Sequence, residues 1–180
     1  MVRPFLLLPF LLACHTAPEW RDTLRQRLPL YGHRNVIAVV DAAYPAQARA
    51  GIETVVTGAD HAATVQLVAE WIAAQRHVRA RVLVDRELAA VPAADAPGID
   101  AWRARLPELL PGGSVTALPH AEIIQRLDQA AATFQVLLLK TDMALPYTSV
   151  FFELECGYWS DAAEQRLRAA LANQPPEQGS

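Results

Sequence analysis

Cysteine and lysine are scarce in this chain of 180 residues. Cys14 and Cys156 are its two cysteines, and Lys140 is its single lysine. The two cysteines belong to no metal-ligand spacing, so the sequence gives no support for a metal site. Almost all positive charge is arginine, and it forms no basic cluster or stripe. Nucleic-acid binding is therefore not expected.

Several motifs of cofactor and hydrolase chemistry are also missing. The sequence contains neither G-x-G-x-x-G nor a Walker loop, so nucleotide binding has no support. It contains no G-x-S-x-G, which weakens a hydrolase interpretation. What it has instead is apolar material: 52% of the residues are hydrophobic and 19% are charged. That balance and length fit one domain with a sizeable core.

The N-terminus has a distinctive order of residues. Arg3 supplies a positive charge, residues 4 to 13 form an apolar stretch too short to span a bilayer, and Cys14 follows Leu-Leu-Ala. This order resembles a bacterial lipoprotein signal. The resemblance implies removal of residues 1–13, a lipid on the Cys14 sulfur, a tether over 14–19, and a periplasmic or extracellular protein anchored to a membrane. The alternative is an apolar N-terminal strand or helix of a cytoplasmic protein.

In the remaining sequence, segments whose apolar residues recur at helical spacing alternate with short apolar segments typical of strands. Helical spacing predicts helices after Pro18 and over 61–75, 99–110, 120–131 and 161–171, with a bend near Pro107. Short apolar or β-branched runs predict strands over 36–40, 51–58, 78–85, 114–118, 134–139 and 150–155. Such alternation is typical of an α/β fold. We expect three layers, α/β/α, around a mixed and mostly parallel sheet, in one domain over 20–172 with a disordered tail over 173–180.

Residues that could do chemistry lie at the ends of the expected strands. His33 precedes the strand at 36–40 and Asp41 follows it, whereas His120 follows the strand at 114–118. Tyr147 and Ser149 lie just before the last strand. Ligands of open α/β sheets favour such loops, although a histidine at an element boundary is more often structural. His33 and Asp41 are eight residues apart, roughly 25 Å in an extended chain, so we expect no contact within one subunit unless the chain bends early or the strand is short. A symmetric oligomer could bring His33 of one subunit against Asp41 of another.

Taken together, these stretches resemble the D-ribose pyranase and L-fucose mutarotase (RbsD/FucU) family. The matching features are Gly32-His33, the Asp41-Ala-Ala-Tyr-Pro45 segment, His120 after a strand, and the Pro-Tyr147-Thr-Ser149 segment before the last strand. The resemblance runs from about residue 20 to about residue 157. It implies an isomerase that interconverts monosaccharide ring forms or anomers, without metal or cofactor. It also implies a ring-like homo-oligomer with active sites between subunits.

The same resemblance assigns roles to individual residues. His33 matches the proton-donating, catalytic histidine, whereas Asp41, His120 and Tyr147 match residues that bind the sugar, which would be ribose, fucose or a similar monosaccharide. Ser149 occupies the position of a sugar-binding asparagine.

The sequence also departs from the family pattern. Arg34-Asn35 stands where the family usually has Gly-Asp, and Asp142-Met143 stands where it usually has Gly-Glu. Two alternatives therefore stay open on the same fold, namely a carbohydrate-binding lipoprotein without turnover and a structural scaffold.

Overall fold

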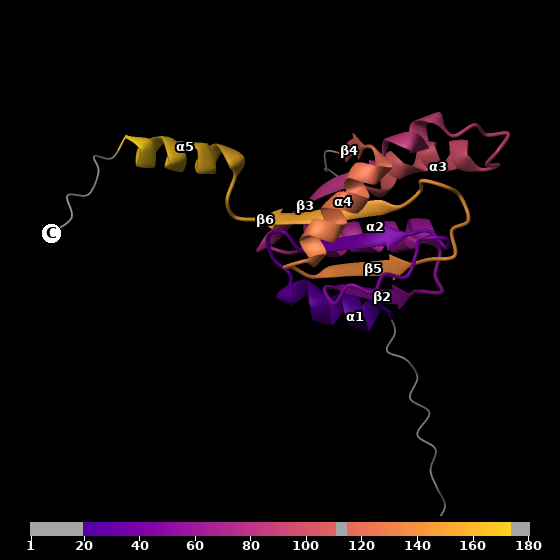
Figure 1. The fold of residues 1–180 in the computed structure, drawn as a ribbon, viewed down its shortest axis with the longest axis horizontal. Helices are drawn as coiled ribbons and strands as arrows, with labels where there is room; N and C mark the ends of the chain where they lie inside the picture. Colours follow the sequence, from indigo (N-terminus) through magenta and orange to yellow (C-terminus); the bar gives the residue numbers. More distant parts are fainter. Residues whose placement is uncertain (1–19, 111–114, 174–180) are drawn as a thin grey trace, which may run out of the picture.

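A computed structural model describes residues 20–110 and 115–173 (Figure 1). The strands are β1 (Val36–Val40), β2 (Ile52–Val56), β3 (Val78–Asp85), β4 (Val115–Leu118), β5 (Val136–Lys140) and β6 (Val150–Cys156). The α-helices are α1 (Trp20–Arg27), α2 (His61–Ala73), α3 (Ile99–Arg105), α4 (His120–Ala131) and α5 (Asp161–Ala172). Three 3₁₀ segments complete the set: η1 (Leu28–Leu30), η2 (Arg86–Ala90) and η3 (Leu106–Leu109).

The expected signal over 1–13, the tether over 14–19 with Cys14, and the tail beyond residue 173 lie outside the described residues. Within the described residues, no helix combines the length and the apolar character needed to cross a membrane.

The six strands form one sheet in the order β2-β5-β1-β6-β3-β4. Neighbours β2, β5 and β1 are parallel, and so are β3 and β4, whereas β6 runs antiparallel to both β1 and β3. The predicted α/β fold with a mixed, mostly parallel sheet is confirmed. The central strand β1 is buried along its whole length, as its run of valine and isoleucine predicts.

Helices cover both faces of the sheet, so the core has two parts. On one face, α1, α2 and α3 pack against side chains such as Ile37 and Phe152. On the other face, α4 packs Ile123 and Leu127 against alternate side chains of the same strands, among them Phe151. Alternation along each strand places successive side chains in different layers, which gives the expected three-layer arrangement.

The predicted helix boundaries are close to the observed ones, and the helix over 99–110 changes character near Pro107, where a bend was expected. The stretch over 99–110 is α3 followed by η3, since Pro107 has no N–H to continue the α-helical hydrogen-bond pattern. Side-chain caps begin two of the helices: Asp60 accepts a hydrogen bond from Ala63 N, and Ser160 accepts one from Ala163 N.

Helix α5 projects away from the sheet after β6 (Figure 1). None of its residues is buried. Its first residue, Asp161, nevertheless forms an ion pair with Arg79 of β3, which ties the base of the helix to the sheet.

A buried histidine at the start of α2 fixes the loop before β6. His61, only 1% exposed at the start of α2, donates through Nε2 to the carbonyl oxygen of Thr148 at 3.0 Å. Its Nδ1 lies 2.7 Å from the Thr141 hydroxyl, and its ring meets the edge of Trp102. The side chain thereby joins α2 to the two ends of the 141–148 loop.

Burial lowers the pKa of His61, an effect that outweighs the hydrogen bond to Thr148 and the nearby carboxylates. The unfolded chain takes up a proton on this imidazole below about pH 6.5, whereas the folded chain resists it. Stability contributed by neutral His61 is therefore lost as pH falls through and below that value.

We expect urea unfolding to show a steeper loss of stability between pH 8 and 5 in the wild type than in His61→Gln. Equal losses in the two proteins would contradict this role.

Candidate functional site at the carboxyl edge of the sheet

The sequence-predicted residues divide between the two edges of the sheet. His33 precedes β1, at the edge where the parallel strands begin, and Asp41 follows β1 at the edge where they end. Five strand residues lie between them, which corresponds to roughly 16 Å of β-strand. One chain therefore does not bring His33 and Asp41 together. The other candidates, His120, Tyr147 and Ser149, all lie at the carboxyl edge with Asp41.

A tight turn fixes the backbone around His33. Asn35 Oδ1 accepts a hydrogen bond from Gly32 N at 2.8 Å, and Asn35 N donates to Gly32 O. Arg34 has a φ of 77°, a left-handed conformation that favours glycine. Its guanidinium lies 5.6 Å from the centre of the Phe134 ring, a cation–π contact. Asn35 thus holds the turn through its amide, and Arg34 adopts the glycine-like conformation that the turn requires.

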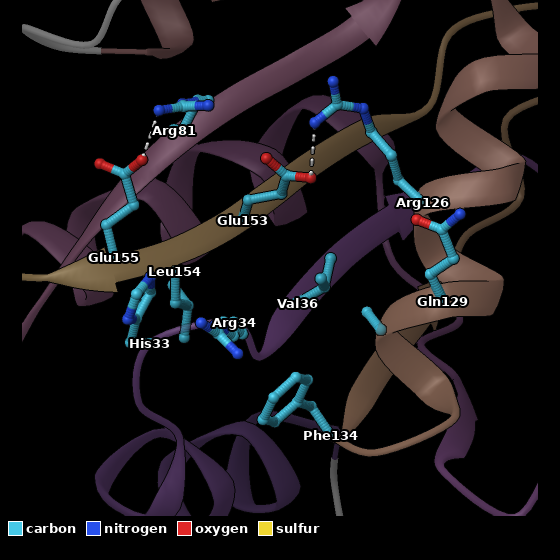
Figure 2. A pocket seen from close by; sticks show the side chains of 11 residues that line it. His33, Arg34, Val36, Arg81, Arg126, Gln129, Phe134, Glu153, Leu154 and Glu155 are labelled. Carbon is cyan, nitrogen blue, oxygen red and sulfur yellow. Dashed lines mark ion pairs between the residues drawn. The ribbon is translucent and has the colours of Figure 1, made fainter.

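The exposed His33 side chain lies on the rim of a cavity of about 430 Å³ (Figure 2). Two ion pairs also line this cavity: Arg81 with Glu155 at 2.7 Å, and Arg126 of α4 with Glu153 at 3.7 Å. The two glutamates share one face of β6, as their alternation predicts, and they are paired with arginines on that face. His33 therefore faces a hollow with mixed charge, away from the other candidate residues.

Asp41 and Ser149 contact each other directly at the carboxyl edge. The Ser149 hydroxyl donates to Asp41 Oδ2 at 2.9 Å and lies 3.3 Å from Asp41 N. Asp41 Oδ1 accepts from Ala43 N at 2.9 Å. Ser149 is 3% exposed, whereas Asp41 is half-buried. The serine thus orients the aspartate from behind, and the carboxylate keeps free lone pairs for further hydrogen bonds.

His120 forms a second pair at this edge, with a residue that sequence reasoning did not select. Its Nδ1 lies 2.9 Å from Oδ1 of Asp85, the last residue of β3. The Asp85 side chain is 1% exposed and that of His120 is 44% exposed. Burial raises the pKa of the Asp85 carboxyl, and the hydrogen bond and charge of His120 oppose that shift. The pair therefore reaches from the interior to the surface.

Tyr147 packs against the His120–Asp85 pair. Its ring meets the His120 ring edge-on, with centroids 5.6 Å apart, and it precedes Ser149 by two residues. Tyr147 has a φ of 57°, an unfavourable left-handed conformation for a residue with a side chain. Strain of this kind costs about 1–3 kcal/mol and is concentrated at functional sites. The carboxyl edge thus carries two hydrogen-bonded pairs, Asp41–Ser149 and His120–Asp85, with the Tyr147 ring packed against His120.

Three ionisable side chains at this edge are influenced by their neighbours or by burial: Asp85, Lys140 and Tyr44. The negative charge of Asp41 contributes to the raised pKa of Asp85, which agrees with the two carboxyls lying on the same edge. Lys140, at the end of β5, donates to the carbonyl oxygen of Tyr44 at 2.7 Å. Burial raises the pKa of the Tyr44 phenol to about 12, so it stays neutral at physiological pH.

Asp85 could have been found from the sequence by the criterion that selected Asp41, since both end a buried strand.

Within residues 20–110 and 115–173, no three histidine, cysteine, aspartate or glutamate side chains gather as metal ligands. The chemistry that this edge offers is proton transfer and hydrogen bonding to hydroxyl groups.

Comparison with known proteins places this geometry in a fold. No protein-family model matches the chain, and no curated protein matches it. Among solved structures, RbsD from Bacillus subtilis in complex with D-ribose matches at a TM-score of 0.53 and 18% identity, covering 74% of this chain and 92% of that one. The fucose mutarotase from Streptococcus pneumoniae in complex with L-fucose matches at 0.51 and 14% identity, covering 79% and 97%. The chain therefore has the fold of the RbsD/FucU proteins.

Proposed function

We propose that this protein is a monosaccharide isomerase of the mutarotase or pyranase type, which interconverts sugar ring forms or anomers by general acid–base catalysis. The observation that carries this proposal is the set of hydrogen-bonding groups at the carboxyl edge, on a fold shared with proteins solved in complex with ribose and fucose. The similarity to those solved structures supports a shared fold, whereas the side chains at this edge support acid–base chemistry on a sugar.

Mutarotation needs little beyond these groups. The anomeric hydroxyl loses a proton, the ring oxygen gains one, and the ring opens and closes again. The reaction involves no change of oxidation state, and a group that titrates near neutral pH is the useful catalyst. The Asp41 carboxylate can accept hydrogen bonds from sugar hydroxyls, and Tyr147 offers a phenol and an apolar ring.

We further propose that the complete site forms between two copies of the chain. His33, the proposed proton donor, lies at the opposite end of β1 from Asp41, so it can serve only the carboxyl edge of a neighbour. Contacts of this head-to-tail kind close into rings when the rotation between copies permits. The exposed position of His33 beside an open cavity is compatible with such a contact.

A second function, sugar binding without turnover, is favoured by the same separation. In a single copy the carboxyl edge holds Asp41, His120 and Tyr147 but lacks His33. A protein that remains monomeric would bind sugar hydroxyls there without the proposed proton donor.

Membrane anchoring through Cys14 is a separate proposal and is compatible with either function.

Anomer exchange measured by saturation-transfer NMR tests the catalytic proposal. With ribose, fucose, galactose and glucose as candidates, we expect the wild type to exchange at least one sugar faster than buffer. His33→Ala should lower that rate by about 10²- to 10⁴-fold, the usual contribution of a general acid or base. His77→Gln is the matched control, because His77 lies at the same edge and its Nε2 donates to the Tyr31 carbonyl oxygen. Sugar binding without exchange in the wild type would support the non-catalytic alternative.

Complementation between inactive variants tests the position of the site. His33→Ala and Asp41→Asn should each be inactive alone, whereas coexpression of the two chains should restore activity. In randomly mixed rings about a quarter of the interfaces would combine an intact His33 with an intact Asp41. We therefore expect about a quarter of wild-type exchange in the mixed protein. No recovery in mixed oligomers would contradict the intersubunit proposal.

A further inference from the structure

We propose that Asp85 is a positioning residue that holds His120 with its proton on Nδ1, so that Nε2 acts as the general base of the proposed sugar isomerisation. The inference rests on the proposed function, and it adds a second proton-transfer group to the one already assigned to His33. It also gives His120 a catalytic role in place of simple sugar contact.

Asp85 is far more buried than the carboxylate of an ordinary surface ion pair. It is the final residue of β3, it pairs in register with Leu118 of β4, and its side chain is 1% exposed. A carboxylate removed from water is costly unless its lone pairs find donors. His120 supplies such a donor at 2.9 Å, from the first residue of α4. The short connection from Leu118 through Pro119 brings the imidazole back over the end of β3.

The chemistry of the two groups decides which nitrogen carries the proton. An ionised carboxylate accepts hydrogen bonds and donates none, so Nδ1 must hold the hydrogen. In the neutral imidazole, Nε2 then has a free lone pair. Because 44% of the His120 side chain is exposed while Asp85 is enclosed, the nitrogen away from Asp85 is the one available to a ligand.

Two further contacts hold His120, one at its backbone and one at its ring. Glu87 of η2 accepts a hydrogen bond from the backbone N–H of His120 at 3.0 Å, which holds the start of α4. Tyr147 meets the imidazole edge-on at 5.6 Å. With Asp85 on Nδ1, the Tyr147 contact limits rotation of the ring and leaves Nε2 on the side of the ring away from Asp85.

The proposed step balances in protons and electrons. His120 Nε2 takes the proton of the anomeric hydroxyl, and the electron pair of that O–H bond forms the carbonyl. The bond between the anomeric carbon and the ring oxygen breaks, and its electron pair goes to the ring oxygen. That oxygen receives a proton from His33 of the neighbouring copy. After rotation about the adjacent carbon–carbon bond, the same transfers run in reverse and close the ring on the other face.

Asp85 contributes in this step by stabilising the imidazolium that forms on His120. A carboxylate that accepts from Nδ1 favours the protonated ring, as in hydrolases that pair aspartate with a catalytic histidine. Removing it should therefore slow the chemistry more than it weakens sugar binding.

Imidazole ¹⁵N NMR on the full chain tests the positioning directly. In protein labelled with ¹⁵N-histidine at about pH 8.5, where imidazoles are neutral, long-range proton–nitrogen spectra identify the protonated nitrogen of each ring. His120→Gln assigns the His120 signals. We expect His120 in the wild type to carry its proton on Nδ1. Asp85→Ala should abolish this preference, and the isosteric Asp85→Asn should weaken it, since an amide can either donate or accept.

Glu87→Gln is the matched control for the NMR measurement. It also converts a carboxylate beside His120 into an amide, but Glu87 contacts the backbone N–H and not the ring. The Glu87→Gln protein should keep the wild-type tautomer. A proton on Nε2 in the wild type, or an unchanged tautomer in Asp85→Ala, would overturn the positioning role.

Kinetics separate this inference from the proposed function. We expect Asp85→Asn to lower the exchange kcat by about 10²-fold while KM for the sugar changes little. Wild-type kcat in Asp85→Asn would overturn the inference and leave the isomerase proposal standing. Exchange at the buffer rate in the wild type itself would overturn the isomerase proposal and the general-base role of His120, while the tautomer measurement would still decide whether Asp85 positions the ring.

Discussion

The reversed direction of β6 is the constraint on which the candidate site depends. All other strands of the sheet point the same way, so their carboxyl ends meet at one edge. Because β6 runs against β1 and β3, its first residues lie at that edge as well. Tyr147 and Ser149, which precede β6, therefore reach Asp41 after β1 and His120 after β4. A sixth parallel strand would have carried the loop before it to the opposite edge.

The same strand geometry separates His33 from the groups it would serve. The stiffness of a paired strand prevents β1 from folding back, so the distance between its two ends is set by its length. The turn that presents His33 is nevertheless well fixed, through Asn35 and through the left-handed conformation of Arg34. Fixing an exposed histidine in this way has a clear use if a second copy of the chain completes the site.

Several departures from the family pattern have a local physical account. Arg34 stands where glycine is usual and still adopts the glycine-like φ, with its guanidinium packed over Phe134. Asn35 replaces a carboxylate and closes the turn through its amide oxygen. Ser149 replaces an asparagine and uses its hydroxyl to orient Asp41. Each substitution keeps the backbone of the site in place, while it changes which atoms remain for a ligand.

The sequence by itself determined the order of helices and strands, the three layers and the positions of His33, Asp41, His120, Tyr147 and Ser149 at strand ends. These features depend on local periodicity and on caps such as Asp60, which nearby residues specify. The sequence also separated His33 from Asp41, at opposite ends of one strand. Only the tertiary structure decided that Asp41, His120, Tyr147 and Ser149 share one edge, and that Asp85 and His61 are polar groups buried beside the site. Contacts between residues 35 or 87 positions apart, as in Asp85–His120 and His61–Thr148, depend on strand order and direction, which local periodicity does not encode.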